Sequence, residues 1–225
     1  MVSNMIEINK LMRSKRKTLS LIVEADGTLT VRAPLRMKEA GIRRFIEVKE
    51  SWIKRKQARA REEAVAPRQY ADGERFWYLG REIPLRIVPD GKPALVVDGA
   101  FKLARSAQPQ AGTVFTAWYK KQARKVLTER VDYFSSKYNF KVGKLRISSA
   151  RTRWGSCSSK KTLSFTWRLV MAPLDVIDYV VVHELCHLNE MSHSKTFWAQ
   201  VEIILPDYKN RRKWLKKNGR FLNLG

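Results

Sequence analysis

The three histidines of this 225-residue chain lie within eleven consecutive positions, and this clustering constrains the fold more than any other feature of the sequence. His183 and His187 are four positions apart, so on an α-helix their imidazoles share a face and reach the same point in space. Glu184 follows the first histidine, where its carboxylate reaches a water on an ion held by the two rings. The segment Val180–Phe197 therefore has the H-E-x-x-H arrangement of zinc hydrolases.

His193 comes six residues after His187. A third ring cannot continue along the same straight helix face at that distance, so the chain must turn back within residues 189–192. Either Ser192 or Ser194 can cap the next helix. Three imidazoles leave one coordination position for water, which is typical of catalytic zinc, whereas structural zinc sites recruit cysteines and close their coordination.

We therefore expect one Zn²⁺, with Glu184 as the general base and metal-bound water as the nucleophile. No further histidine exists to activate Ser156 or Cys157, so neither is expected to be a nucleophile. Three acidic residues are candidates to orient the imidazole N–H groups, and the sequence does not choose among them: Asp175, Asp178 and Glu190.

The polar stretch Arg151–Lys161 (RTRWGSCSSKK) combines cations, hydroxyls and one tryptophan. Such a loop can supply hydrogen-bond donors to a substrate anion or oxyanion. The run from this loop through W-R-L and V-I-D-Y-V-V-V-H-E-L-C-H-L to H-S-K-x-F-W resembles the YgjP-like metallopeptidase family of bacterial zincins. Weaker similarity covers nearly the whole chain, including K-T-L-S-L, W-I-x-R-K and L-P-D-Y-K-x-R-R-K-W-L.

The resemblance implies a zincin-like core with a single metal. It gives His183, Glu184, His187 and His193 the roles argued above. It also implies that three residues of the polar stretch line the substrate cleft: Arg153, Trp154 and Ser156.

Periodicity and turn signals predict an α+β fold. The expected elements are a hairpin at residues 18–33, a basic helix at 38–63, a small antiparallel sheet within 74–104, a long helix at 114–137, strands at 144–149 and 163–170, and helices at 173–189 and 194–205. Two stretches are expected to be linkers, residues 64–73 and 105–113. We accordingly expect an N-terminal α+β region over 1–113 and a zincin-like catalytic region over 114–225.

Charge and cysteine content indicate a compartment and classes of partner. The formal charge of +24 favours contact with polyanions, including weak nucleic-acid binding. With only two cysteines, Cys157 and Cys186, the chain has no disulfide framework, which favours a reducing compartment. The first 17 residues lack an apolar signal segment, and no apolar run approaches the ~18 residues of a membrane span. We expect a cytoplasmic protein without membrane contact, and the sequence leaves its oligomeric state open.

Three functions are compatible with these features. The first is a metallopeptidase that binds an extended peptide along the strand at Leu163–Val170. The second is a metal-dependent nucleoside triphosphate pyrophosphatase, since the same metal-bound water can attack phosphorus and the cations of Arg151–Lys161 suit a triphosphate. The third is a nucleic-acid-associated peptidase, suggested by the basic segments 38–63 and 209–217.

Overall fold

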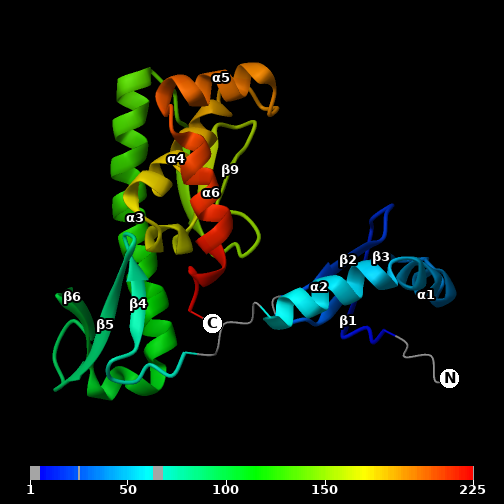
Figure 1. The fold of residues 1–225 in the computed structure, drawn as a ribbon, viewed down its shortest axis with the longest axis horizontal. Helices are drawn as coiled ribbons and strands as arrows, with labels where there is room; N and C mark the ends of the chain where they lie inside the picture. The colour runs from blue at the N-terminus through cyan, green and yellow to red at the C-terminus, as the bar shows by residue number, and fades with distance from the viewer. Residues whose placement is uncertain (1–5, 25, 63–67, 225) are drawn as a thin grey trace. The chain divides into compact units, whose positions relative to one another are not determined.

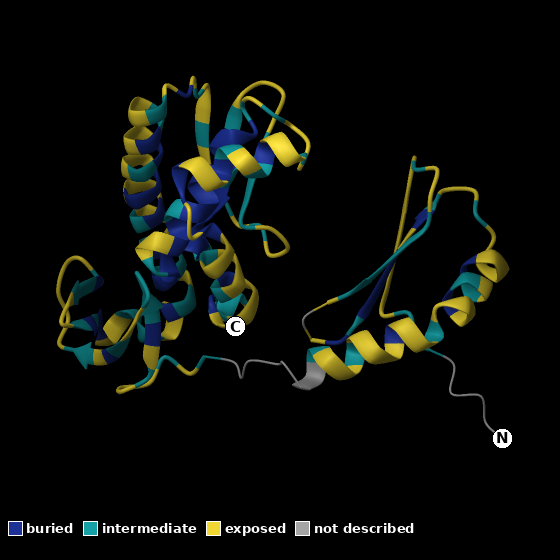
Figure 2. Ribbon diagram, turned by 45° about the horizontal axis from the view of Figure 1, so that its top comes forward, coloured by how far each residue is buried: buried dark blue, intermediate teal, exposed yellow. Residues whose placement is uncertain are grey.

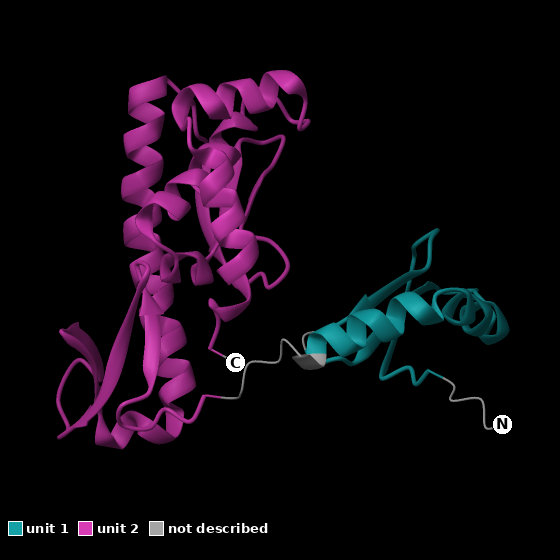
Figure 3. Cartoon of the chain, viewed as in Figure 1, with its two compact units in different colours: residues 1–66 teal, residues 67–225 magenta. Residues whose placement is uncertain are grey.

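The computed structural model describes residues 6–24, 26–62 and 68–224, and the chain divides into two compact units, residues 1–66 and 67–225 (Figure 3). We expected a boundary between residues 113 and 114. The division lies instead in the first predicted linker, residues 64–73, part of which is outside the described residues. The predicted α+β class is confirmed, since helices and small mixed sheets occur in both units.

Unit 1 is a three-stranded sheet covered on one face by two helices. Its elements are β1 (Lys10–Ser14), β2 (Ser20–Val23), β3 (Leu29–Pro34), α1 (Glu39–Val48) and α2 (Glu50–Glu62), with strand order β1-β3-β2 (Figure 1). Alternate residues of β3 face the helices, so its apolar side chains meet those of α1 and α2 in a core of Leu29, Val31, Ala33, Ile42, Ile46 and Ile53.

The hairpin predicted around Asp26–Gly27 is confirmed as β2 and β3, which pair antiparallel. The Asp26 carboxylate accepts a hydrogen bond from the Thr28 backbone N–H at 2.9 Å, and Gly27 has φ 84°. The single helix predicted at 38–63 is two helices, because Lys49 (φ −102°, ψ 8°) leaves helical geometry. Strand β1 was not predicted: it is exposed along its whole length and has no apolar alternation.

Unit 2 begins with a four-stranded sheet in the order β4-β5-β7-β6. The strands are β4 (Arg75–Tyr78), β5 (Arg81–Val88), β6 (Leu95–Asp98) and β7 (Ala100–Ala104). The predicted sheet was antiparallel throughout, which is wrong for one pair, since β5 and β7 run parallel. The chain crosses to the outer position as β6 and then turns at Gly99 (φ 67°), so β7 returns between β6 and β5 in the direction of β5.

The second predicted linker, residues 105–113, is structured as the 3₁₀-helix η1 (Arg105–Gln110) and the first turn of α3 (Ala111–Tyr138). Phe76 of β4 and Phe115 of α3 pack with ring centroids 4.4 Å apart. The sheet and the long helix therefore share one hydrophobic core, which is why no boundary falls at residue 113.

The remainder of unit 2 carries the histidines. It comprises β8 (Lys144–Ser148), β9 (Gly155–Cys157), β10 (Thr162–Thr166), η2 (Trp167–Met171), α4 (Leu174–Cys186), α5 (Lys195–Ile204), α6 (Tyr208–Asn218) and η3 (Gly219–Phe221). In the order β8-β10-β9, β10 is central, parallel to β8 and antiparallel to β9. The strand predicted at 163–170 thus ends at Thr166, and the polar stretch 151–161 contains the edge strand β9.

Helix α4 runs through the interior of unit 2, where most of its residues are buried (Figure 2). Its start is fixed by the β4–β5 turn, in which Leu79 N–H donates to the Val170 carbonyl at 2.9 Å and Gly80 N–H to that of Met171 at 3.1 Å. Its middle is fixed by α3, since Arg130 forms a two-pronged ion pair with Asp178 at 2.6 and 2.9 Å. The helix that bears the histidines is therefore held from two sides. None of the helices in the described residues is long and apolar enough to cross a membrane.

Candidate metal centre

The three histidines come from the end of α4 and the turn that follows it. His183 lies in the last turn of α4, and His187 is the residue at which the helix ends. The chain then reverses, as predicted, and α5 begins after Ser194, whose Oγ accepts a hydrogen bond from Phe197 N–H at 3.2 Å. This reversal returns His193 to the other two rings.

The imidazoles converge through their Nε2 atoms. The Nε2 atom of His183 lies 3.3 Å from that of His187 and 3.1 Å from that of His193. One nitrogen from each of the three rings lies within 4.8 Å of the others. The structure thus brings together all three histidines that the sequence singled out.

Aromatic and backbone contacts set the ring orientations. His187 Nδ1–H donates to the Glu190 carbonyl oxygen at 3.0 Å, which leaves its Nε2 lone pair toward the other rings. Phe197 stacks on His187 with ring centroids 4.5 Å apart, and Trp198 stacks on His193 at 5.7 Å.

The acidic side chains offered as orienting partners make other contacts. Asp178 pairs with Arg130, as described above. The Glu190 carboxylate accepts hydrogen bonds from the hydroxyl and the backbone N–H of Ser192, at 2.7 and 3.0 Å. Asp175 is exposed. The partner of His187 is thus a backbone carbonyl, which a sequence cannot distinguish from any other carbonyl.

The donor set fits a tetrahedral ion such as Zn²⁺. Zn–N bonds of about 2.0–2.1 Å in tetrahedral geometry place ligand nitrogens about 3.3 Å apart, and the distances of 3.3 and 3.1 Å from His183 Nε2 to the other two Nε2 atoms match this value. Burial, followed by the charges of His187 and His193, lowers the pKa of His183 to about 3, so its imidazole is neutral and can ligate.

Glu184 follows His183 in α4 and is only 5% exposed. Burial raises the pKa of its carboxyl group to about 7, and the positive charge of Arg153 opposes part of that shift. A carboxyl group with this pKa can both accept and release a proton near neutral pH.

Gly155 of β9 packs directly against Glu184. A Cβ added at Gly155 would lie 2.6 Å from the Cγ and Oε1 atoms of Glu184. Only glycine therefore allows the carboxylate to occupy this position. We did not single out Gly155 from the sequence, although it is the one glycine in the polar stretch 151–161.

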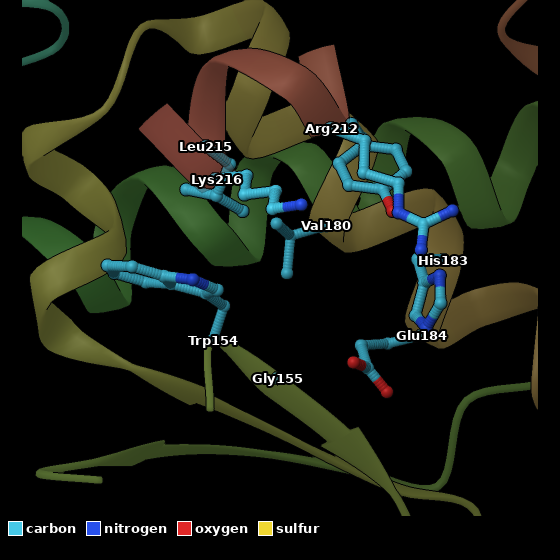
Figure 4. A pocket seen from close by; sticks show the side chains of 9 residues that line it. Trp154, Gly155, Val180, His183, Glu184, Arg212, Leu215 and Lys216 are labelled. Atoms are coloured by element: carbon cyan, nitrogen blue, oxygen red, sulfur yellow. The ribbon is translucent and has the colours of Figure 1, made fainter. Parts of the chain in front are cut away.

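A cavity of about 350 Å³ adjoins the centre (Figure 4). Strand β9 and the residue before it form one wall, α4 the inner end with His183 and Glu184, and α6 the opposite wall. The contributions of α6 are Arg212, Leu215 and Lys216.

The three residues implied to line the cleft have different positions. Trp154 lines the cavity. Arg153 is exposed and acts on Glu184 through its charge, while Ser156 is not among the lining residues. Sequence reasoning missed Arg212 and Lys216, because the tail was recognised only as basic and no motif marks which face of α6 meets the cavity. It also missed Tyr179 of α4.

Three comparisons with known proteins bear on the family of this chain. The crystal structure of the metallopeptidase zymogen of Pyrococcus abyssi abylysin matches with 19% sequence identity and a TM-score of 0.37, covering 40% of this chain and 93% of that chain. No curated protein matches. The family described as "YgjP-like, metallopeptidase domain" matches residues 17–218, so the chain belongs to the YgjP-like metallopeptidase family.

Proposed function

We propose that this protein is a zinc-dependent peptidase in which His183, His187 and His193 hold the ion and Glu184 is the general base. The observation that carries the proposal is the convergence of three Nε2 atoms beside a buried carboxylate at the inner end of an open cavity. When bound there, zinc lowers the pKa of its water and polarises the attacked carbonyl group.

The protein groups have separate tasks in this reaction. Glu184 accepts the proton of the attacking water and delivers it to the amine that leaves. Gly155 leaves the space that the Glu184 carboxylate occupies, since an added Cβ would lie 2.6 Å from its Oε1 atom. The Glu190 carbonyl and the ring of Phe197 keep His187 in the orientation that directs Nε2 inward.

The peptide substrate needs a different strand from the one we expected. β-addition along Leu163–Val170 is excluded because β10 already has a strand on each side. Of the two edge strands, β8 and β9, it is β9 that lines the cavity together with Glu184. Hydrogen bonds from Thr166 N–H to the Trp154 carbonyl and from Ser158 N–H to the Thr162 carbonyl show that Trp154 and Ser158 direct their backbone groups toward β10. Successive residues of a strand direct these groups to opposite sides. The backbone groups of Gly155 and Cys157 therefore point away from β10, toward a strand-like peptide passing Glu184.

The test compares zinc-loaded wild-type protein with Glu184→Gln, using unfolded protein and a panel of nucleoside triphosphates as substrates. Glu129→Gln, an exposed glutamate of α3, serves as the matched control. We expect peptide-bond hydrolysis by the wild type and the control, reduced at least about 10²-fold in Glu184→Gln, the usual contribution of a general base. Hydrolysis of triphosphates alone would contradict the peptidase assignment, and full activity of Glu184→Gln would contradict the assignment of the base.

A further inference from the structure

Two cations of α6 line the cavity beside the histidines. Arg212 and Lys216 are four residues apart on the helix, so they share a face, and both extend toward the cavity from α6 (Figure 4). No ion pair within the described part of the chain involves either side chain. The cavity therefore has positive charge available to a ligand.

The guanidinium group of Arg212 is held close to the metal centre. It lies over the ring of Trp198, 5.1 Å from the centroid. Trp198 in turn stacks on His193 with an interplanar angle of 24°. These ring contacts place the positive charge close enough to act on His183 and His193.

Apart from Glu184 and His183 at the inner end, the cavity is lined by mainly apolar side chains beside these cations. They include Trp154, Val180 and Leu215. The Trp154 ring is held against η3, since a Cβ added at Gly219 would lie 2.7 Å from its Cζ2 atom. An apolar wall with cations along one side suits a carboxylate carried on a short apolar stem.

Two observations favour a carboxylate over the phosphates of a nucleotide. The lining residues of α4 and α6 lie beyond the first turn of each helix, away from its N-terminal N–H groups. Phosphate sites use helix N-termini instead. The volume of about 350 Å³ is also at the small end of the range of ligand pockets, about 300–1,000 Å³, which fits one residue.

We propose that this cavity binds the substrate residue next to the scissile bond and selects a carboxylate there, supplied by an acidic side chain or by the free C-terminus of the peptide. The substrate class would then be peptides that are acidic at this position or that end there. This inference rests on the peptidase function proposed above.

The test measures peptide binding without turnover, using zinc-loaded Glu184→Gln protein. The ligands are acetyl-Ala-Ala-Glu-amide and acetyl-Ala-Ala-Gln-amide for the side-chain source, and acetyl-Ala-Ala-Ala as free acid and as amide for the C-terminal source. We expect the carboxylate form of at least one pair to bind about ten-fold more tightly than its neutral partner, as a charge-assisted hydrogen bond allows. The pair that shows the preference identifies the source.

Matched substitutions distinguish a carboxylate preference that arises in the cavity from one that arises from the net charge of +24 or from the metal ion. In the same background, Lys216→Met should remove most of the preference. Lys217→Met, which changes the same charge at an exposed neighbour outside the cavity, should leave it intact. A preference that survives both Lys216→Met and Arg212→Met comes from the metal and overturns the proposal. Thermal melting confirms that each variant is folded.

Hydrolysis of the same peptides by the wild type distinguishes this inference from the proposed function. Carboxylate-selective binding without hydrolysis of any peptide would contradict the proposed peptidase function and support the carboxylate subsite. Hydrolysis with no carboxylate preference would contradict the subsite and support the peptidase function. A nucleoside triphosphate that displaces every peptide at a ten-fold lower concentration would overturn the assignment to a peptide carboxylate.

Discussion

The contact between Gly155 and Glu184 makes a quantitative prediction. In Gly155→Ala the new methyl group would lie 2.6 Å from the Glu184 carboxylate oxygen and from Cγ, and 2.8 Å from Cδ. Ordinary contacts between carbon atoms are about 3.5–4.0 Å, so the carboxylate must move by about 1 Å. A misplacement of this size in a catalytic group costs up to about 10²-fold in rate. We expect kcat/KM to fall by about that factor.

The assay is hydrolysis of unfolded protein, accompanied by metal analysis and thermal melting. Gly91→Ala is the control, because an added Cβ there meets no atom within 4 Å. The histidine nitrogens are not displaced in Gly155→Ala, so its zinc content should equal that of the wild type. A folded, zinc-loaded Gly155→Ala protein with wild-type activity would refute the claim that this glycine positions the base.

Three further predictions concern the metal, the ion pair and pH. Chelation should abolish activity and leave the far-ultraviolet circular dichroism spectrum at 25 °C unchanged, since the apolar side chains of α4 are buried in the core of unit 2; unfolding on chelation would indicate a structural site. Asp178→Asn should lower the free energy of unfolding by about 3 kcal/mol in urea titrations, because Arg130 loses its partner; an unchanged midpoint would contradict this. In metal-free protein the lowered pKa of His183 means that the unfolded chain takes up a proton first, so stability should fall as pH falls from 6.5 toward 3. Urea titrations at pH 7 and pH 5 test this, and His183→Asn should reduce the difference.

The grouping of the three histidines could be predicted from the sequence because it depends on local geometry. The spacing of His183 and His187 on a helix determines that their rings meet, and the polar turn before Ser194 determines that the chain reverses. The predicted hairpin at Asp26–Gly27 succeeded for the same reason, since its turn depends on neighbouring residues alone.

Features that depend on distant parts of the chain could not be predicted in this way. The division into units was placed at 113 because residues 105–113 resemble a linker, whereas the packing of Phe76 on Phe115 joins both sides of it. The parallel pairing of β5 and β7 depends on strand order. Arg212 reaches the cavity only because α6 packs against α4, and nothing near residue 212 indicates that partner.

X-ray absorption spectroscopy of the zinc-loaded protein tests the central claim most directly. We expect one ion per chain, with three imidazole nitrogens at about 2.0–2.1 Å and one oxygen from water. His193→Ala should lose one imidazole from this set. A sulfur ligand, a complete set of protein ligands without water, or an unchanged spectrum in His193→Ala would contradict the account.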